Sequence, residues 1–80
     1  MRTPLSSMRP GQHGTVVSIG DTGALRQRLI AMGLTPGAEI SLRKYAPLGD
    51  PLEIRIRNFE LSIRRRDAES ILVDRGEDAR

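Results

Sequence analysis

The segment 25–37 constrains the fold most strongly, because it is the one stretch of the chain with helical periodicity. Its large apolar residues recur at the i, i+4 and i+7 spacing of one helix face, and they are Leu25, Leu29 and Met32. The helix is predicted to begin near Ala24, with Asp21 or Thr22 as its N-cap. It must pack against whatever structure the rest of the chain builds.

The same segment also encodes the end of the helix. Gly33 can adopt the left-handed backbone that stops a helix, and Leu34 can then fold back onto Leu29, as in a Schellman motif. Pro36 and Gly37 follow in the order of the two central residues of a type II turn. Helix, stop, turn and strand are thus predicted within about a dozen residues, and such agreement between local signals indicates a committed structure.

Most of the remaining apolar residues alternate with polar ones over short runs, which is the pattern of half-buried β-strands. Five such strands are predicted, at 14–19, 39–46, 52–57, 59–63 and 70–73. Residues 64–69 suit one turn of helix. Because short strands with one apolar face each close most economically as a barrel, we predict a mostly β fold. It is a small β-barrel of about five strands with one short helix.

The two ends of the chain lack these patterns. Residues 1–13 carry turn residues and are predicted to form a lead-in without regular structure, pinned to the core by Leu5 and Met8. Residues 75–80 are predicted to be a disordered charged tail. The expected domain therefore spans residues 1–74.

Length and composition limit the class of protein. A chain of 80 residues has room for one domain with a small hydrophobic core. It has no cysteine, which excludes disulfides, thiolate metal sites and a thiol nucleophile. No apolar run approaches the roughly 18 residues of a membrane-spanning helix, and the polar N-terminus lacks the apolar region of a signal peptide. We predict a cytoplasmic protein that does not insert directly into a membrane.

Three blocks together resemble a known family. They are 28–37 (RLIAMGLTPG), 46–51 (APLGDP) and 61–64 (LSIR) leading to Ala68 and Glu69, and their order and spacing are similar to those of the FeoA family. This resemblance implies an SH3-like β-barrel and a cytoplasmic accessory role in bacterial ferrous iron uptake. The partner it implies is the cytoplasmic domain of FeoB, a membrane permease with a GTP-binding domain. A similar domain ends the iron-dependent DtxR-type repressors, so a free-standing relative of that domain is an alternative.

The polar residues do not form the pattern of a catalytic or metal site. His13 is the only histidine and has no patterned carboxylate beside it, whereas iron and zinc sites need several converging ligands. Residues 49–51 lack the lysine and the glycine spacing of a P-loop. One histidine also gives no basis for a Ser-His-Asp arrangement. We predict a non-enzymatic protein without catalytic residues, metal ligands or a cofactor.

Nucleic-acid binding is a second hypothesis, because small barrels with clustered arginines bind RNA or DNA. The arginines that would form the cluster are Arg43, Arg55, Arg57 and Arg64–Arg66. Glutamates at 39, 53 and 60 interleave with them, which favours cross-strand charge pairing on a solvated face. Tyr45 and Phe59 are the only aromatic residues, too few for a base-stacking platform. Nucleic acid is therefore not the favoured partner.

Two segments are candidate surfaces for docking a protein. The helix and its end place Arg26 and Arg28 beside Ile30 and Leu34, and an apolar group rimmed by arginine is typical of interfaces. The alternative for this segment is a helix that caps the barrel with a solvated polar face. In the loop 46–51, two prolines either pre-order a barrel corner or present Leu48 as a stiff anchor. The predicted partner-binding residues are Arg26, Arg28, Ile30, Leu34 and Leu48.

Overall fold

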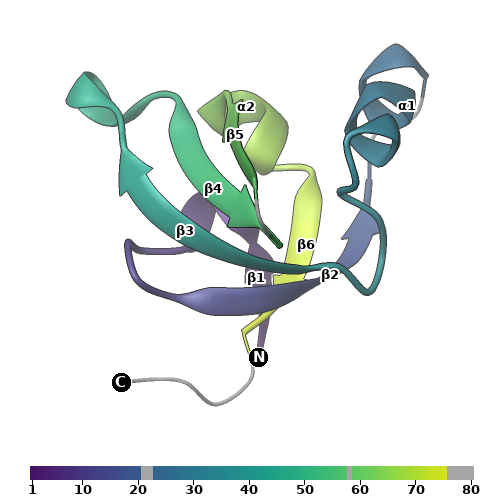
Figure 1. The fold of residues 1–80 in the computed structure, drawn as a ribbon, viewed down its shortest axis with the longest axis horizontal. Helices are drawn as coiled ribbons and strands as arrows, with labels where there is room; N and C mark the ends of the chain where they lie inside the picture. The colour runs from purple at the N-terminus through teal and green to yellow at the C-terminus, as the bar shows by residue number, and fades with distance from the viewer. Residues whose placement is uncertain (21–22, 58, 76–80) are drawn as a thin grey trace.

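The structure, a computed structural model, describes residues 1–20, 23–57 and 59–75. Six strands form one antiparallel sheet in the order β1-β6-β2-β3-β4-β5 (Figure 1). The strands are β1 (Arg2–Pro4), β2 (His13–Ile19), β3 (Glu39–Tyr45), β4 (Leu52–Ile56), β5 (Phe59–Ile63) and β6 (Ile71–Asp74). The helices are α1 (Ala24–Ala31) and α2 (Arg65–Ala68), with 3₁₀ turns η1 (Leu5–Ser7) and η2 (Pro47–Gly49).

The prediction of a mostly β fold is confirmed. Strands β2 to β6 correspond to the five predicted strands, α1 to the predicted helix and α2 to the predicted helical turn. The predicted N-caps Asp21 and Thr22 lie outside the described residues, as do residues 76–80 of the predicted tail.

Strand β1 was missed, and the expectation of an irregular lead-in was wrong for this part. It pairs with β6 in the register Arg2↔Asp74 and Thr3↔Val73, next to the chain's other end. A strand of three residues that pairs so far along the chain leaves no local hydrophobic pattern. Proline is compatible with the position of Pro4, because β1 lies at the edge of the sheet.

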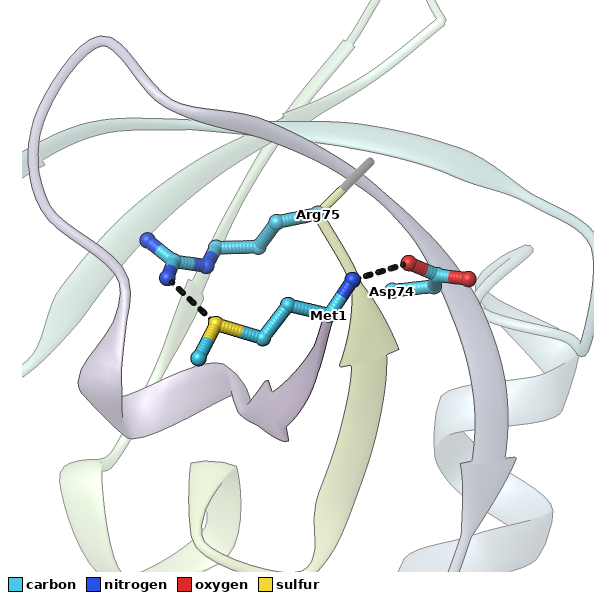
Figure 2. A network of polar contacts seen from close by, with 3 residues as sticks. All are labelled: Met1, Asp74 and Arg75. Atoms are coloured by element: carbon cyan, nitrogen blue, oxygen red, sulfur yellow. Dashed lines mark hydrogen bonds and ion pairs between the residues drawn. The ribbon is translucent and has the colours of Figure 1, made fainter. Parts of the chain in front are cut away.

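Polar contacts join the first residue to the end of β6 (Figure 2). The Met1 amino group lies 3.0 Å from Asp74 Oδ1. The Arg75 backbone N–H donates to the Met1 carbonyl at 2.9 Å, and its guanidinium Nη2 lies 3.2 Å from the Met1 sulfur. These contacts extend the β1–β6 ladder by one residue.

The core lies on the inner face of the sheet and draws on nearly every element. In β4, Leu52, Ile54 and Ile56 are buried and alternate with more exposed residues, as the sequence pattern predicts. Leu5 and Met8 are fully buried, which confirms that they pin the N-terminal segment. Leu25, Ile30 and Met32 of the helical segment, together with Tyr45 and Leu61, are partly buried against this core.

Helix α1 ends as its sequence predicts. Gly33 has a φ of 99°, its N–H donates to the Ile30 carbonyl, and the Leu34 N–H donates to the Leu29 carbonyl, both at 3.0 Å. These two bonds define a Schellman motif, and they satisfy carbonyls that the helix end leaves free. Leu34 and Leu29 are both buried in the core, so the stop also fixes how the helix packs.

The turn after the helix is also confirmed. The Ala38 N–H donates to the Thr35 carbonyl at 2.9 Å, and Gly37 has the positive φ (95°) that the third position of a type II turn requires. Gly37 in turn donates its N–H to the Val16 carbonyl of β2 at 2.8 Å. The turn thereby sets the register in which β3 joins the sheet.

Replacing Gly33 with valine is expected to lower the free energy of unfolding by more than about 1 kcal/mol, because a β-branched residue resists the left-handed backbone. Gly33→Asn is the matched control, since asparagine tolerates that conformation and should cost less. Urea denaturation of the three proteins measures the difference. Equal stabilities of the valine variant and the native chain would contradict the role of Gly33 as the helix stop.

Candidate docking surface

The loop between β3 and β4 presents one fully exposed leucine. Leu48 has a relative exposure of 103%, and its backbone is left-handed, with a φ of 71°. Gly49 follows with a φ of 81°, and the bond between Asp50 and Pro51 is cis. A non-glycine residue held in this region costs about 1–3 kcal/mol and persists only where its surroundings impose it.

Arg65, the first residue of α2, holds this loop in place. Its backbone N–H donates to Asp50 Oδ1 at 2.9 Å, and its Nε donates to the Gly49 carbonyl at 3.0 Å. From the same guanidinium, Nη1 donates to the Ser6 carbonyl at 3.0 Å. One side chain thus connects α2, the β3–β4 loop and η1, which are far apart in the sequence.

Tyr45 adds a second brace under the same guanidinium. The Arg65 guanidinium carbon lies 5.1 Å from the centre of the Tyr45 ring, a distance typical of a cation–π contact. The Tyr45 hydroxyl donates to the Met8 carbonyl, just after η1. Because the loop backbone is fixed by these contacts, Leu48 has little backbone freedom left to lose on binding.

The sequence predicted Leu48 as a docking residue but gave no indication of Arg65, the residue that positions its loop. The sequence placed Arg65 in a cationic edge for nucleic-acid binding, and this placement is wrong, because the Arg65 guanidinium donates to the carbonyls of Gly49 and Ser6. Residues 64–66 are three consecutive arginines, so the sequence did not indicate which of them contacts the loop. Neither did the sequence indicate the left-handed backbone of Leu48.

The helix residues of the predicted docking patch are less accessible. Arg28 is exposed, and Arg26 and Ile30 are half-buried, but Leu34 has a relative exposure of 0%. The Schellman motif turns Leu34 into the core, so it supports the helix and does not offer a contact surface. Leu34 is therefore removed from the docking residues.

The remaining candidates do not form one continuous patch. Figure 1 shows α1 and the β3–β4 loop at opposite ends of the molecule along its longest axis. Arg26, Arg28 and Ile30 thus belong to one surface and Leu48 to another. A partner would have to span both ends to touch all four residues.

The arginines proposed for nucleic-acid binding are also divided. Arg43 Nη1 lies 2.7 Å from Glu60 Oε2, which is cross-strand charge pairing of the kind predicted from the sequence. This pair is largely solvated and contributes only about 0–1 kcal/mol, but it occupies Arg43. With Arg65 also engaged, two members of the predicted cluster are committed to contacts within the chain.

No metal centre is formed by the residues that the structure describes. No three His, Cys, Asp or Glu side chains among them are placed to hold one metal ion. His13 is exposed at the start of β2. Among the helices of these same segments, none is long and apolar enough to cross a membrane.

The fold matches solved FeoA structures. The solution structure of FeoA from Chlorobium tepidum has a TM-score of 0.90 and 35% identity, covering 98% of this chain and 74% of that one. Stenotrophomonas maltophilia FeoA in complex with zinc, described as a prokaryotic SH3 domain protein, has a TM-score of 0.75 and 26% identity, covering 92% of this chain and 89% of that one. The molecule is thus a small SH3-like domain, as the resemblance implied.

The sequence itself gives the family. Residues 3–75 match the FeoA domain. A protein of Porphyromonas gingivalis, a fusion of Fe(2+) transport protein A with the Fe(2+) transporter FeoB, is 36% identical over 70 residues; these are 88% of this chain and 8% of the fusion protein. The chain belongs to the FeoA family, whose members are non-enzymatic accessory proteins.

Replacing Arg65 with alanine is expected to lower the free energy of unfolding by about 1–3 kcal/mol, because the carbonyls of Ser6 and Gly49 lose their donor. Amide hydrogen exchange in residues 46–51 should accelerate at the same time. Arg65→Lys should recover only part of the loss, since an ammonium group lacks the planar fork of a guanidinium.

The neighbouring Arg66 provides the control for this prediction. Its side chain is exposed, so Arg66→Ala should change stability by less than about 0.5 kcal/mol. If both alanine variants had the same stability and the same loop exchange, Arg65 would not be the residue that holds the loop.

Proposed function

We propose that this chain is an accessory protein of ferrous iron transport that binds the cytoplasmic part of a FeoB-type permease and modulates its activity. The observation that carries the proposal is the Porphyromonas gingivalis fusion protein, in which a related domain and the FeoB transporter share one polypeptide. Covalent linkage keeps two domains at high effective concentration. A separate chain needs a contact surface to achieve the same association. This proposal places the protein in the cytoplasm, where that part of the permease lies.

Leu48 is the proposed anchor of the contact. Among the described residues, Leu48 and Met1 are the large apolar side chains that lie exposed. A few residues contribute most of the binding energy of an interface, and an exposed apolar side chain that enters a pocket of the partner is removed from water. The loop that carries Leu48 is held by Arg65 and Tyr45, so the side chain is presented in one backbone conformation. The proposed second contact, at the other end of the molecule, consists of Arg26, Arg28 and Ile30.

The activity that this protein modulates resides in the partner. The FeoA family is non-enzymatic, and the sequence has no P-loop. A regulator of this kind acts by binding one state of its partner more tightly than another. For a GTP-binding partner, the states to compare are those with and without guanine nucleotide.

A pull-down of the FeoB cytoplasmic domain by the purified protein tests the association. Retention is expected, and it is measured with and without guanine nucleotide at two salt concentrations. Leu48→Gly should weaken binding by at least about tenfold, because it removes the anchor. Glycine suits the left-handed backbone at this position, so the variant should fold at least as stably as the native chain.

Two further variants separate the candidate surfaces. Leu48→Met keeps an apolar side chain of similar size and should retain the partner, whereas Arg26→Glu tests the α1 surface with the loop intact. Loss of binding in the Arg26 variant alone would move the docking site to α1. Failure of the folded native protein to retain the domain at either salt concentration would contradict the proposed association.

A further inference from the structure

A concavity of about 670 Å³ lies on the outer face of the sheet, away from Leu48. It is lined by residues 13–15 at the start of β2, by Gly37 and residues 39–41 at the start of β3, by Arg55 of β4 and Arg57 just after it, and by Asp74 and Arg75 at the end of β6. Its charged residues are Glu39, Arg55, Arg57, Asp74 and Arg75. Glu39 begins β3 and Leu48 follows its end, so the length of β3 separates the concavity from the proposed anchor.

Three arginines that make few side-chain contacts within the described residues line this concavity, namely Arg55, Arg57 and Arg75. Arg55 and Arg57 are exposed, and within residues 1–20, 23–57 and 59–75 neither makes an ion pair or a side-chain hydrogen bond. The guanidinium of Arg75 contacts the thioether of Met1, which is a weak acceptor. Among the residues that the structure describes, none of these three guanidinium groups pairs with a carboxylate, so their charge is available to a ligand.

The acidic residues of the concavity leave it net positive. Asp74 lies 3.0 Å from the Met1 amino group, so part of its charge is already balanced. Glu39 is exposed on β3, opposite Thr15 of β2. Three guanidinium groups against these two carboxylates favour an anionic ligand, while the interspersed negative charge disfavours a continuous polyphosphate.

Arg57 stands in a backbone conformation that its residue type disfavours. It has a φ of 54° at the first position of the two-residue turn between β4 and β5, since Ile56 pairs with Phe59. Asparagine, aspartate and glycine are the usual residues in such turns. A strained residue at the rim of a binding surface supports a functional reason for its side chain.

The spacing of Arg55 and Arg57 indicates the shape of the ligand. Arg55 and Arg57 flank Ile56, the last extended residue of β4, so their Cα atoms are about 7 Å apart, and both residues line the concavity. Alternate side chains of an extended peptide have the same spacing, and the guanidinium fork binds a carboxylate through two parallel hydrogen bonds. We propose that this concavity binds an acidic, extended peptide segment of a protein partner, with Arg55 and Arg57 each engaging one carboxylate.

Nuclear magnetic resonance titration with blocked peptides tests this site. The probe is acetyl-Thr-Glu-Thr-Glu-Thr-amide, compared with an isomer that has adjacent glutamates and with a version that has glutamine in their place. The alternating probe should shift backbone amide signals of β2, β3 and β4 and bind more tightly than the isomer. The glutamine version should produce no shifts at the same concentrations.

Variants of the protein supply the matched comparison. Arg55→Gln with Arg57→Gln should weaken binding of the alternating probe by about tenfold or more, because two charge-assisted contacts are lost. Arg64→Gln with Arg66→Gln removes the same charge outside the concavity and should change affinity by less than about twofold. Arg57→Asn suits the left-handed turn, so it should melt no lower than the native chain and still bind the probe more weakly.

Several outcomes would overturn the proposal. Equal losses in the two double variants would indicate attraction by net charge alone. Tighter binding of a thymidine hexanucleotide than of the alternating probe would make the concavity a nucleic-acid site. Absence of shifts with the native protein, confirmed as folded by the same spectra, would show that the concavity does not bind acidic peptides.

Discussion

Burial of apolar residues in one small core is the constraint on which the rest of the structure depends. A chain of this size removes only roughly 60% of its surface from water, so each element must contribute. Strand β4 supplies Leu52, Ile54 and Ile56, the N-terminal segment supplies Leu5 and Met8, and the helix end supplies Leu29 and Leu34. The helices α1 and α2 and the segment that carries Leu5 and Met8 therefore cover one sheet. Their positions follow from which apolar residues they must bury.

The polar contacts of Arg65 fix the conformation of a loop that hydrophobic burial does not determine. Hydrophobic packing fixes the strands but does not dictate the path of the loop between β3 and β4. The guanidinium donates to carbonyls of Gly49 and Ser6 and stacks on Tyr45, and these directional bonds select one loop conformation. The result is a leucine side chain in solvent on a fixed backbone. A side chain held on a fixed backbone loses little conformational entropy when it enters a pocket of a partner.

The two proposed binding surfaces differ in chemistry and in place. Leu48 offers an apolar anchor beyond one end of β3, whereas Arg55, Arg57 and Arg75 line a charged concavity near the other end. An apolar anchor contributes affinity through desolvation, and a charged concavity contributes mostly specificity and association rate. A partner that contacts both Leu48 and the concavity would lie along the β3–β4 hairpin. Two separate binding surfaces suit the accessory role that we propose for this non-enzymatic protein.

Features whose signals are local could be predicted from the amino-acid sequence. Five strands, helix α1, the Schellman stop at Gly33 and the Pro36-Gly37 turn were predicted because each depends on residues within a few positions of one another. Other features follow only from the tertiary structure. These are the pairing of β1 with β6, the burial of Leu34, which removes it from the docking residues, and the role of Arg65 among three consecutive arginines. The tertiary structure also decided the left-handed backbone of Leu48 and the gathering of Arg55, Arg57 and Arg75. These features depend on contacts such as that between Arg65 and Ser6, 59 residues apart, and they form only once the sheet has closed the distance between such segments.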